Sequence, residues 1–151
     1  MDEIKYLGHL PTSALERVIV GEEMPSFLRQ VFPTQLIFPT GRIGYVDFQL
    51  MNNSTWGGEF LYINTIAIEP AYRKQGYGEA LLDKLEEIAQ ERRVPKILTS
   101  GVWIDNIRMI SLLEKMEYRQ YRKKSQIHWR IHQRKYPNHI ISVLFEKMMK
   151  M

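Results

Sequence analysis

The chain has 151 residues, of which 44% are hydrophobic, and this length and composition predict one globular domain spanning residues 1–151. It contains no cysteine, which excludes disulfides, a thiolate nucleophile and cysteine-based metal sites. A net charge of +4 and an isoelectric point near 9.3 suit a polyanionic partner, either a phosphorylated small molecule or a nucleic acid. Because no run of about 18 apolar residues and no signal-peptide pattern occurs, we expect a cytoplasmic protein that does not bind membranes.

Residues 1–33 carry signals for a strand followed by two helices. Residues 4–7 suit a short strand, and the capping-box pattern from Ser13 to Glu16 predicts a helix that Gly21 would end. Pro25 suits a first helical turn and Pro33 prevents continuation, so a second helix is expected between them.

Two strands are expected next, at residues 35–38 and 42–51, joined by turn-forming residues at 39–41. In the second strand alternating positions differ in polarity, which predicts a half-buried strand. A polar loop at residues 52–58 follows, and we expect its Trp56 to pack against the protein rather than to contact a substrate.

A strand, a loop and a helix then follow in direct succession. Ile66, Ala67 and Ile68 suit a buried strand, which Pro70 ends because proline fixes φ and has no N–H donor. From Gly78 onward apolar residues recur at helical spacing, which predicts a surface helix. Its inward-facing residues are Leu81, Leu82, Leu85, Ile88 and Ala89.

The loop between this strand and helix has the sequence Arg73-Lys74-Gln75-Gly76-Tyr77-Gly78. Its two glycines let a backbone approach a ligand closely, the helix start offers unpaired N–H groups, and two cations add charge, so the loop predicts an anion site. An ordinary helix cap is the alternative. A dinucleotide-binding motif would need glycine at Leu81 and a P-loop would need Gly-Lys-Ser/Thr, so both are excluded.

The C-terminal part predicts a strand at 96–103, a helix capped by Asp105 or Asn106, and a basic hairpin. Apolar and polar residues alternate at residues 127–132, which predicts one strand of the hairpin, and residues 139–145 are expected to form the other. No carboxylate or cysteine accompanies the three histidines of this region, so we expect no metal site. The helix should turn inward Ile107, Ile110, Leu112, Leu113 and Met116, and the histidines are His128, His132 and His139.

The loop resembles the diagnostic motif of the GNAT superfamily of N-acetyltransferases, which is arginine or glutamine, two residues, glycine, one residue, then glycine or alanine. In that family the preceding strand pairs with the pantetheine arm of acetyl-CoA and the loop amides hold the pyrophosphate. Residues 106–118 continue the resemblance, since the family commonly has a coenzyme-contacting asparagine and then a helix ending in Tyr-Glu-Lys-x-Gly-Phe. The resemblance assigns the pantetheine to Ile66, Ala67 and Ile68, the pyrophosphate to Arg73, Lys74, Gln75, Gly76, Tyr77, Gly78 and Glu79, and a further coenzyme contact to Asn106.

The chain departs from the family pattern at two positions. Glu117 stands where a glycine normally takes the left-handed conformation that closes the helix, at an expected cost of about 1 kcal/mol if that conformation is kept. Leu113 stands where many family members have the tyrosine that protonates the departing thiolate. The catalytic residues therefore stay unassigned, and Tyr62 and Glu59 are the candidates for handling protons.

The resemblance implies an α/β GNAT fold, a mixed and mostly antiparallel sheet flanked by helices and splayed between the strands near 61–68 and 96–103. It implies transfer of the acetyl group of acetyl-CoA to an amine, of a small molecule or a protein, by direct attack in a ternary complex and without a metal. One alternative is a nucleic-acid-binding module on the basic hairpin, where Tyr121, Trp129 and Tyr136 lie among the cations. The other is a GNAT protein that binds acyl-CoA without turnover. Nucleic acid is the less favoured partner, and a homodimer is left open.

Overall fold

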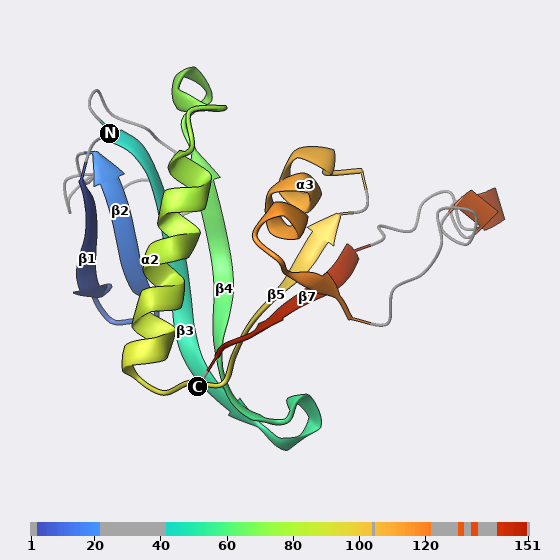
Figure 1. Ribbon diagram of the computed structural model, residues 1–151, viewed down its shortest axis with the longest axis horizontal. Coiled ribbons are helices and arrows are strands. Elements are labelled where there is room, and N and C mark those ends of the chain that lie inside the picture. The colour runs from blue at the N-terminus through green and yellow to red at the C-terminus, as the bar shows by residue number, and fades with distance from the viewer. Residues whose placement is uncertain are drawn as a thin grey trace. The chain divides into compact units, whose positions relative to one another are not determined.

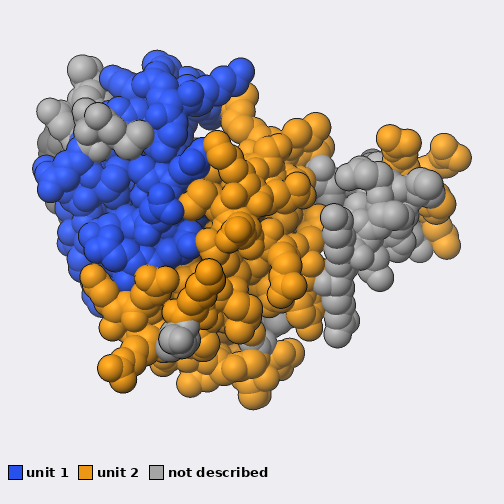
Figure 2. Space-filling model, in the orientation of Figure 1, with its two compact units in different colours: residues 1–50, 63–88 blue, residues 51–62, 89–151 orange. Residues whose placement is uncertain are grey.

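The computed structural model describes residues 3–21, 42–103, 105–121, 130–131, 134–135 and 142–150 (Figure 1). These residues belong to two compact units, each built from separate stretches of the chain (Figure 2). Unit 1 contains residues 1–50 and 63–88, and unit 2 contains residues 51–62 and 89–151. Within the described part of the chain, no helix is long and apolar enough to cross a membrane.

Unit 1 is an antiparallel sheet covered on one face by a helix (Figure 1). The strands follow the order β1 to β4, and β4 continues into unit 2 because the division falls between Tyr62 and Ile63. Val18 at the centre of β2 pairs with Tyr6 on one side and with Val46 on the other. The elements are β1 (Ile4–His9), β2 (Glu16–Gly21), β3 (Arg42–Asn53), β4 (Gly58–Ile68) and α2 (Tyr77–Glu91).

The helix predicted between Ser13 and Gly21 is wrong, because this stretch forms the buried strand β2. The run Val18-Ile19-Val20 is β-branched and at most 2% exposed, which favours a strand between two neighbours. Ser13 does act as a local acceptor, but its Oγ takes a hydrogen bond from the amide of Leu15 at 3.0 Å within the turn between β1 and β2. The burial of the run at residues 18–20 thus outweighs the capping-box pattern at residues 13–16.

The strand predicted at 42–51 is confirmed as β3, but its half-buried character is wrong, since residues 43–48 are all buried. Asp47 is buried because Arg17 of β2 binds it through two hydrogen bonds, Nε to Oδ1 at 2.6 Å and Nη2 to Oδ2 at 2.8 Å. The Arg17 guanidinium also lies 4.4 Å from the centre of the Tyr45 ring. A carboxylate that is paired with an arginine can therefore occupy a buried position, although the alternation of polar and apolar residues assigned this position to the solvent-exposed face.

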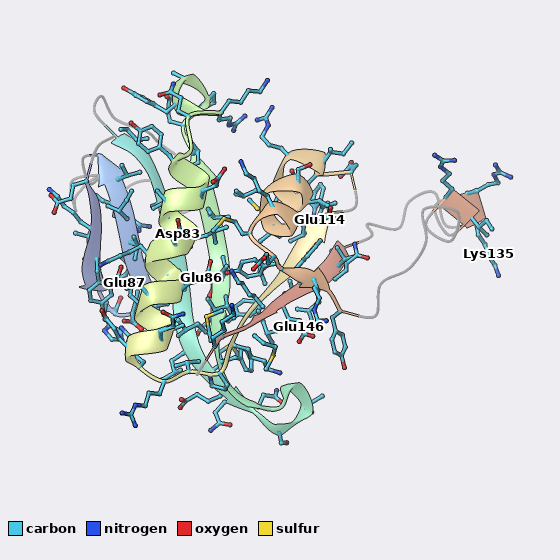
Figure 3. The ribbon with its side chains drawn as sticks, viewed as in Figure 1. Asp83, Glu86, Glu87, Glu114, Lys135 and Glu146 are labelled. Atoms are coloured by element: carbon cyan, nitrogen blue, oxygen red, sulfur yellow. The ribbon has the colours of Figure 1, made fainter. Side chains whose placement is uncertain are left out.

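The helix predicted after the loop is confirmed as α2, and its five predicted inward residues are all at most 5% exposed. Acidic residues lie on its other face, where Asp83 and Glu87 are exposed (Figure 3). The helix ends in a Schellman motif at Arg93, which has φ +55, and the amide of Val94 donates to the carbonyl of Ala89 at 2.9 Å.

Unit 2 contains the last residues of β3 and of α2, the first residues of β4, and three further strands in the order β4, β5, β7, β6. Both described pairs are antiparallel, with Leu98 opposite Glu146 and Gln120 opposite Phe145. The short 3-10 helix η1 (Ser54–Trp56) lies in the predicted polar loop, and the side chain of Trp56 lies outside the described part of the chain. The remaining elements are β5 (Lys96–Trp103), α3 (Ile107–Lys115), β6 (Arg119–Gln120) and β7 (Ser142–Met148).

Helix α3 confirms the predicted N-cap and shows how the helix closes without glycine. Asn106 accepts a hydrogen bond from the amide of Met109 at 3.2 Å, and Leu113 is buried at 1% exposure. Ile107, predicted to face inward, is 73% exposed, because a side chain in the first turn leans past the end of its helix. Glu117 keeps the left-handed conformation with φ +68, and the amide of Tyr118 donates to the carbonyl of Leu113 at 2.8 Å.

The basic hairpin is described only in part. The strand predicted at 127–132 is wrong at residues 130–131, which are helical, as are residues 134–135. A short alternating pattern does not exclude a helix, and arginine, lysine and glutamine all favour one. The final predicted strand, 139–145, is confirmed at residues 142–145, which belong to β7; this strand extends to Met148, and residues 139–141 lie outside the described residues. The predicted helix between Pro25 and Pro33, the strand at 35–38 and the three histidines lie outside the described residues.

Candidate functional site

The end of β4 is fastened to β3 in unit 1. After Ile68 the amide of Glu69 donates to the carbonyl of Ile43 at 2.8 Å. The carboxylate of Glu69 then accepts from the amide of Ala71 at 3.1 Å and caps the 3-10 helix η2 (Pro70–Tyr72). The proline and this side-chain cap together end the strand and direct the chain into the loop before α2.

The loop presents backbone amides at the start of a helix. Lys74 and Gly76 both have left-handed conformations, with φ +64 and +88. The first hydrogen bond within α2 runs from the amide of Ala80 to the carbonyl of Gly76 at 3.1 Å, so the amides of Tyr77 and Gly78 have no acceptor inside the helix. Left-handed residues within such a turn orient successive N–H groups into an anion-binding concavity, and the helix dipole favours negative charge there.

The loop side chains divide into charged and structural residues. Arg73 and Lys74 are exposed, and Arg73 Nε donates to the carbonyl of Ile68 at 3.3 Å, which places its cation beside the end of β4. Tyr77 is 8% exposed and contacts the Tyr72 ring edge to face at 6.3 Å. Tyr77 is one of the residues assigned to the pyrophosphate. Its ring is packed in the protein, so its backbone amide is the group that could contact a ligand.

Ile66, Ala67 and Ile68 are partly exposed, although a buried strand was predicted. The apolar run is therefore only partly buried, which leaves side-chain surface at the end of β4 accessible to a ligand. This end leads directly into the amide-rich loop, so a long ligand could extend along the strand and place an anionic group at the helix start.

The two candidates for proton handling lie in unit 2 and have different surroundings. Glu59 is exposed. Tyr62 is half-buried, and its hydroxyl is hydrogen-bonded to the hydroxyl of Ser100 on the neighbouring strand β5. Sequence reasoning missed Ser100, because nothing local in the chain indicates which residue of β5 stands beside Tyr62.

Asn106 and Leu113 also lie in unit 2. The carboxamide oxygen of Asn106 caps α3, and the predicted contact of Asn106 with a coenzyme stays a prediction. Leu113 faces the interior, so no acid acts from this position. Within the described residues no group of three or more histidine, aspartate or glutamate side chains could hold a metal ion.

A comparison with protein families shows which family the chain belongs to. Residues 28–118, well over half of the chain, match the family described as the acetyltransferase (GNAT) family. The chain belongs to the acetyltransferase (GNAT) family. This confirms the resemblance drawn from Arg73, Gly76 and Gly78, and the mixed sheet with flanking helices is the fold of this family.

Relatives of this GNAT chain differ in what their names say they acetylate. It is 26% identical over 132 residues to a glucosamine 6-phosphate N-acetyltransferase of Trypanosoma brucei brucei, covering 82% of this chain and 85% of the relative. Its fold is similar to that of the IAA acetyltransferase from Bacillus cereus, with TM-score 0.62, 12% identity, and 98% and 99% of the two chains covered. It is also similar to Arabidopsis thaliana NAA60 in complex with acetyl-CoA, with TM-score 0.60, 17% identity, and 91% and 77% covered.

Proposed function

We propose that this GNAT protein transfers the acetyl group of acetyl-CoA to an amine by direct attack within a ternary complex. The observation that carries the proposal is the loop at 73–78, where two left-handed residues and two cations precede the helix α2. A pyrophosphate would be held by the amides of this loop, and the pantetheine arm would follow residues 66–68. A splay of the sheet between β4 and β5, which would admit this arm, stays a prediction.

The chemistry needs one new bond, one broken bond and two proton transfers. The neutral amine nitrogen attacks the thioester carbon, the carbon–sulfur bond breaks, the nitrogen loses one proton and the sulfur gains one; an ammonium must first lose a further proton to the solvent. A lysine-like amine has a pKa near 10.4, so at pH 7 about one molecule in 2,500 is uncharged, a penalty of roughly 4.6 kcal/mol. A group must therefore remove the ammonium proton, and backbone amides near Ala67 would stabilise the carbonyl oxygen, a contribution of about 3 kcal/mol.

We infer that Tyr62 rather than Glu59 handles a proton in this reaction. The Tyr62 hydroxyl is half-buried and oriented by Ser100, whereas the Glu59 carboxylate is exposed to water. An oriented, partly desolvated hydroxyl can relay a proton, whereas an exposed carboxylate offers little over solvent. Tyr62→Phe should lower kcat about a hundredfold, and Glu59→Gln should change it less than about threefold.

The direct mechanism is tested by initial rates of thiol release with both substrates varied. A covalent acetyl-cysteine cannot form in a chain without cysteine, so intersecting reciprocal plots are expected. Parallel plots would contradict the ternary complex. Glucosamine 6-phosphate is the first acceptor to try, since a relative is named for it, followed by peptides with a free N-terminus and by polyamines.

The two rival functions predict different results. A GNAT protein that binds acyl-CoA without turnover would be stabilised by acetyl-CoA but would release no thiol with any amine. A nucleic-acid module would bind RNA or DNA with a steep dependence on salt, and reversing Arg130 and Arg134 to glutamate would weaken that binding. Under the transferase proposal the same double reversal lowers the use of acidic acceptors and leaves coenzyme affinity within about twofold.

A further inference from the structure

Gly44 of β3 lies against the end of β4 at the point where the coenzyme is proposed to bind. A Cβ atom on residue 44 would lie 2.6 Å from the carbonyl oxygen of Ala67 and 2.7 Å from Cδ1 of Ile68. The first atom is backbone, so it cannot move away by changing a rotamer. Any larger residue at this position must therefore displace the Ala67 peptide.

The short distance between a Cβ at residue 44 and the Ala67 oxygen also indicates where this carbonyl lies. In a regular ladder a carbonyl lies near the plane of the sheet, while a Cβ projects out of that plane. The Ala67 carbonyl oxygen therefore occupies the space into which a side chain of Gly44 would project. Because the peptide group is planar and trans, the N–H of Ile68 points in the direction opposite to the Ala67 carbonyl.

The next residue prevents β4 from relaxing this contact. The amide of Glu69 donates to the carbonyl of Ile43 at 2.8 Å, so the chain is hydrogen-bonded to β3 directly beyond the Ala67–Ile68 peptide. A Cβ at residue 44 therefore strains the short stretch 67–68 rather than moving the whole strand. This stretch is partly exposed and precedes the amide loop.

We propose that Gly44 is a positioning residue for the coenzyme, because its missing side chain lets the Ala67 peptide present the Ile68 amide to the thioester end of acetyl-CoA. The inference rests on the proposed acetyl-CoA site. It separates two parts of that site: the amide loop at 73–78 holds the pyrophosphate, and Gly44 controls only the strand that receives the pantetheine and its acetyl group. Gly44 is thus assigned a role in coenzyme binding although it does not contact the coenzyme.

The test compares two ligands on purified full-length protein by calorimetry. Acetyl-CoA contacts both parts of the site, whereas 3′-phosphoadenosine 5′-diphosphate contains the pyrophosphate and no pantetheine. Gly44→Ala should raise the Kd for acetyl-CoA about tenfold or more and change the Kd for the nucleotide fragment by less than about twofold. Hydrogen exchange should become faster at residues 66–69 and stay unchanged in α2.

Two further variants separate positioning from loss of stability. Val46→Ala, two residues along the same buried strand, lowers the Tm without adding an atom, and both ligands should keep their affinities. If Gly44→Ala does not fold, both ligands are measured on the double variant Gly44→Ala with Ile68→Ala. There the close contact with Cδ1 of Ile68 is gone, the backbone contacts with the Ala67 oxygen and the Ile68 Cα remain, and acetyl-CoA should still be the ligand that binds more weakly.

The outcomes distinguish this inference from the function on which it rests. If acetyl-CoA does not bind the parent protein, the proposed function fails. If acetyl-CoA binds the parent but Gly44→Ala weakens both ligands equally or neither of them, the positioning role of Gly44 is refuted and the acetyl-CoA site stands.

Discussion

The strained closure of α3 offers a direct measurement of backbone energy in this protein. Glu117 closes the helix in a left-handed conformation, φ +68, which glycine adopts without steric cost. Its side chain is exposed, so removing it sacrifices little packing. Both Schellman hydrogen bonds, from the amides of Glu117 and Tyr118, use backbone atoms and would persist in a glycine variant. Glu117→Gly should therefore stabilise the fold.

The size of this effect follows from two opposing contributions. Relief of the left-handed strain raises the free energy of unfolding by about 1–2 kcal/mol. The greater freedom of glycine in the unfolded chain lowers it by about 0.4–1 kcal/mol. The net increase in the free energy of unfolding is about 0.5–1 kcal/mol. For a chain of this length the Tm should rise by about 1–4 °C.

Two control variants isolate the backbone contribution. Glu117→Gln removes the negative charge from the helix C-terminus but keeps the strain, so it should gain only a few tenths of a kcal/mol, roughly 0.3. Glu114→Gly makes the same substitution in the helical part of α3, on an exposed side chain (Figure 3), and should destabilise by about 1 kcal/mol. Urea titration followed by circular dichroism measures all three variants. If Glu117→Gly is no more stable than Glu117→Gln, the strain argument is refuted.

Three further outcomes test the site and the core. Acetyl-CoA at about 100 times its Kd should add about 2.7 kcal/mol to the free energy of unfolding, and Gly76→Val should remove most of that gain; an unchanged Tm with ligand would contradict the coenzyme site. Asp47→Ala should lower the free energy of unfolding by about 3–5 kcal/mol, because it leaves the Arg17 guanidinium buried beside an apolar side chain; a loss below about 1 kcal/mol would show that the pair is dispensable. Leu113→Tyr should raise kcat less than about tenfold and Leu113→Phe should only disturb packing, since the position is buried; a hundredfold gain from tyrosine would favour the weakly catalytic alternative.

Local signals predicted the backbone of the strand end, the loop and the helix that follow one another from Ile66 to Glu91. Pro70 ends β4, Gly76 turns the loop, and the apolar spacing from Leu81 onward forms α2, as expected. Each of these signals acts within a few residues, because proline, glycine and helical periodicity constrain the backbone near their own positions. The family motif lies inside this same stretch, which is why the sequence sufficed to predict the family. The binding of an anion by the loop stays a prediction.

Tertiary contacts decided the features whose partners lie far away in the chain. Asp47 is buried rather than wet because Arg17, 30 residues earlier, binds it, and Tyr62 is oriented by Ser100, 38 residues later. The capping signal at Ser13 does not start a helix, because the apolar run at residues 18–20 pairs with β1 on one side and with β3 on the other. The constraint on Gly44 comes from Ala67 of another strand, whose carbonyl oxygen a Cβ at residue 44 would meet at 2.6 Å. Pairing, register and burial are properties of neighbouring strands, and no pattern within one strand contains them.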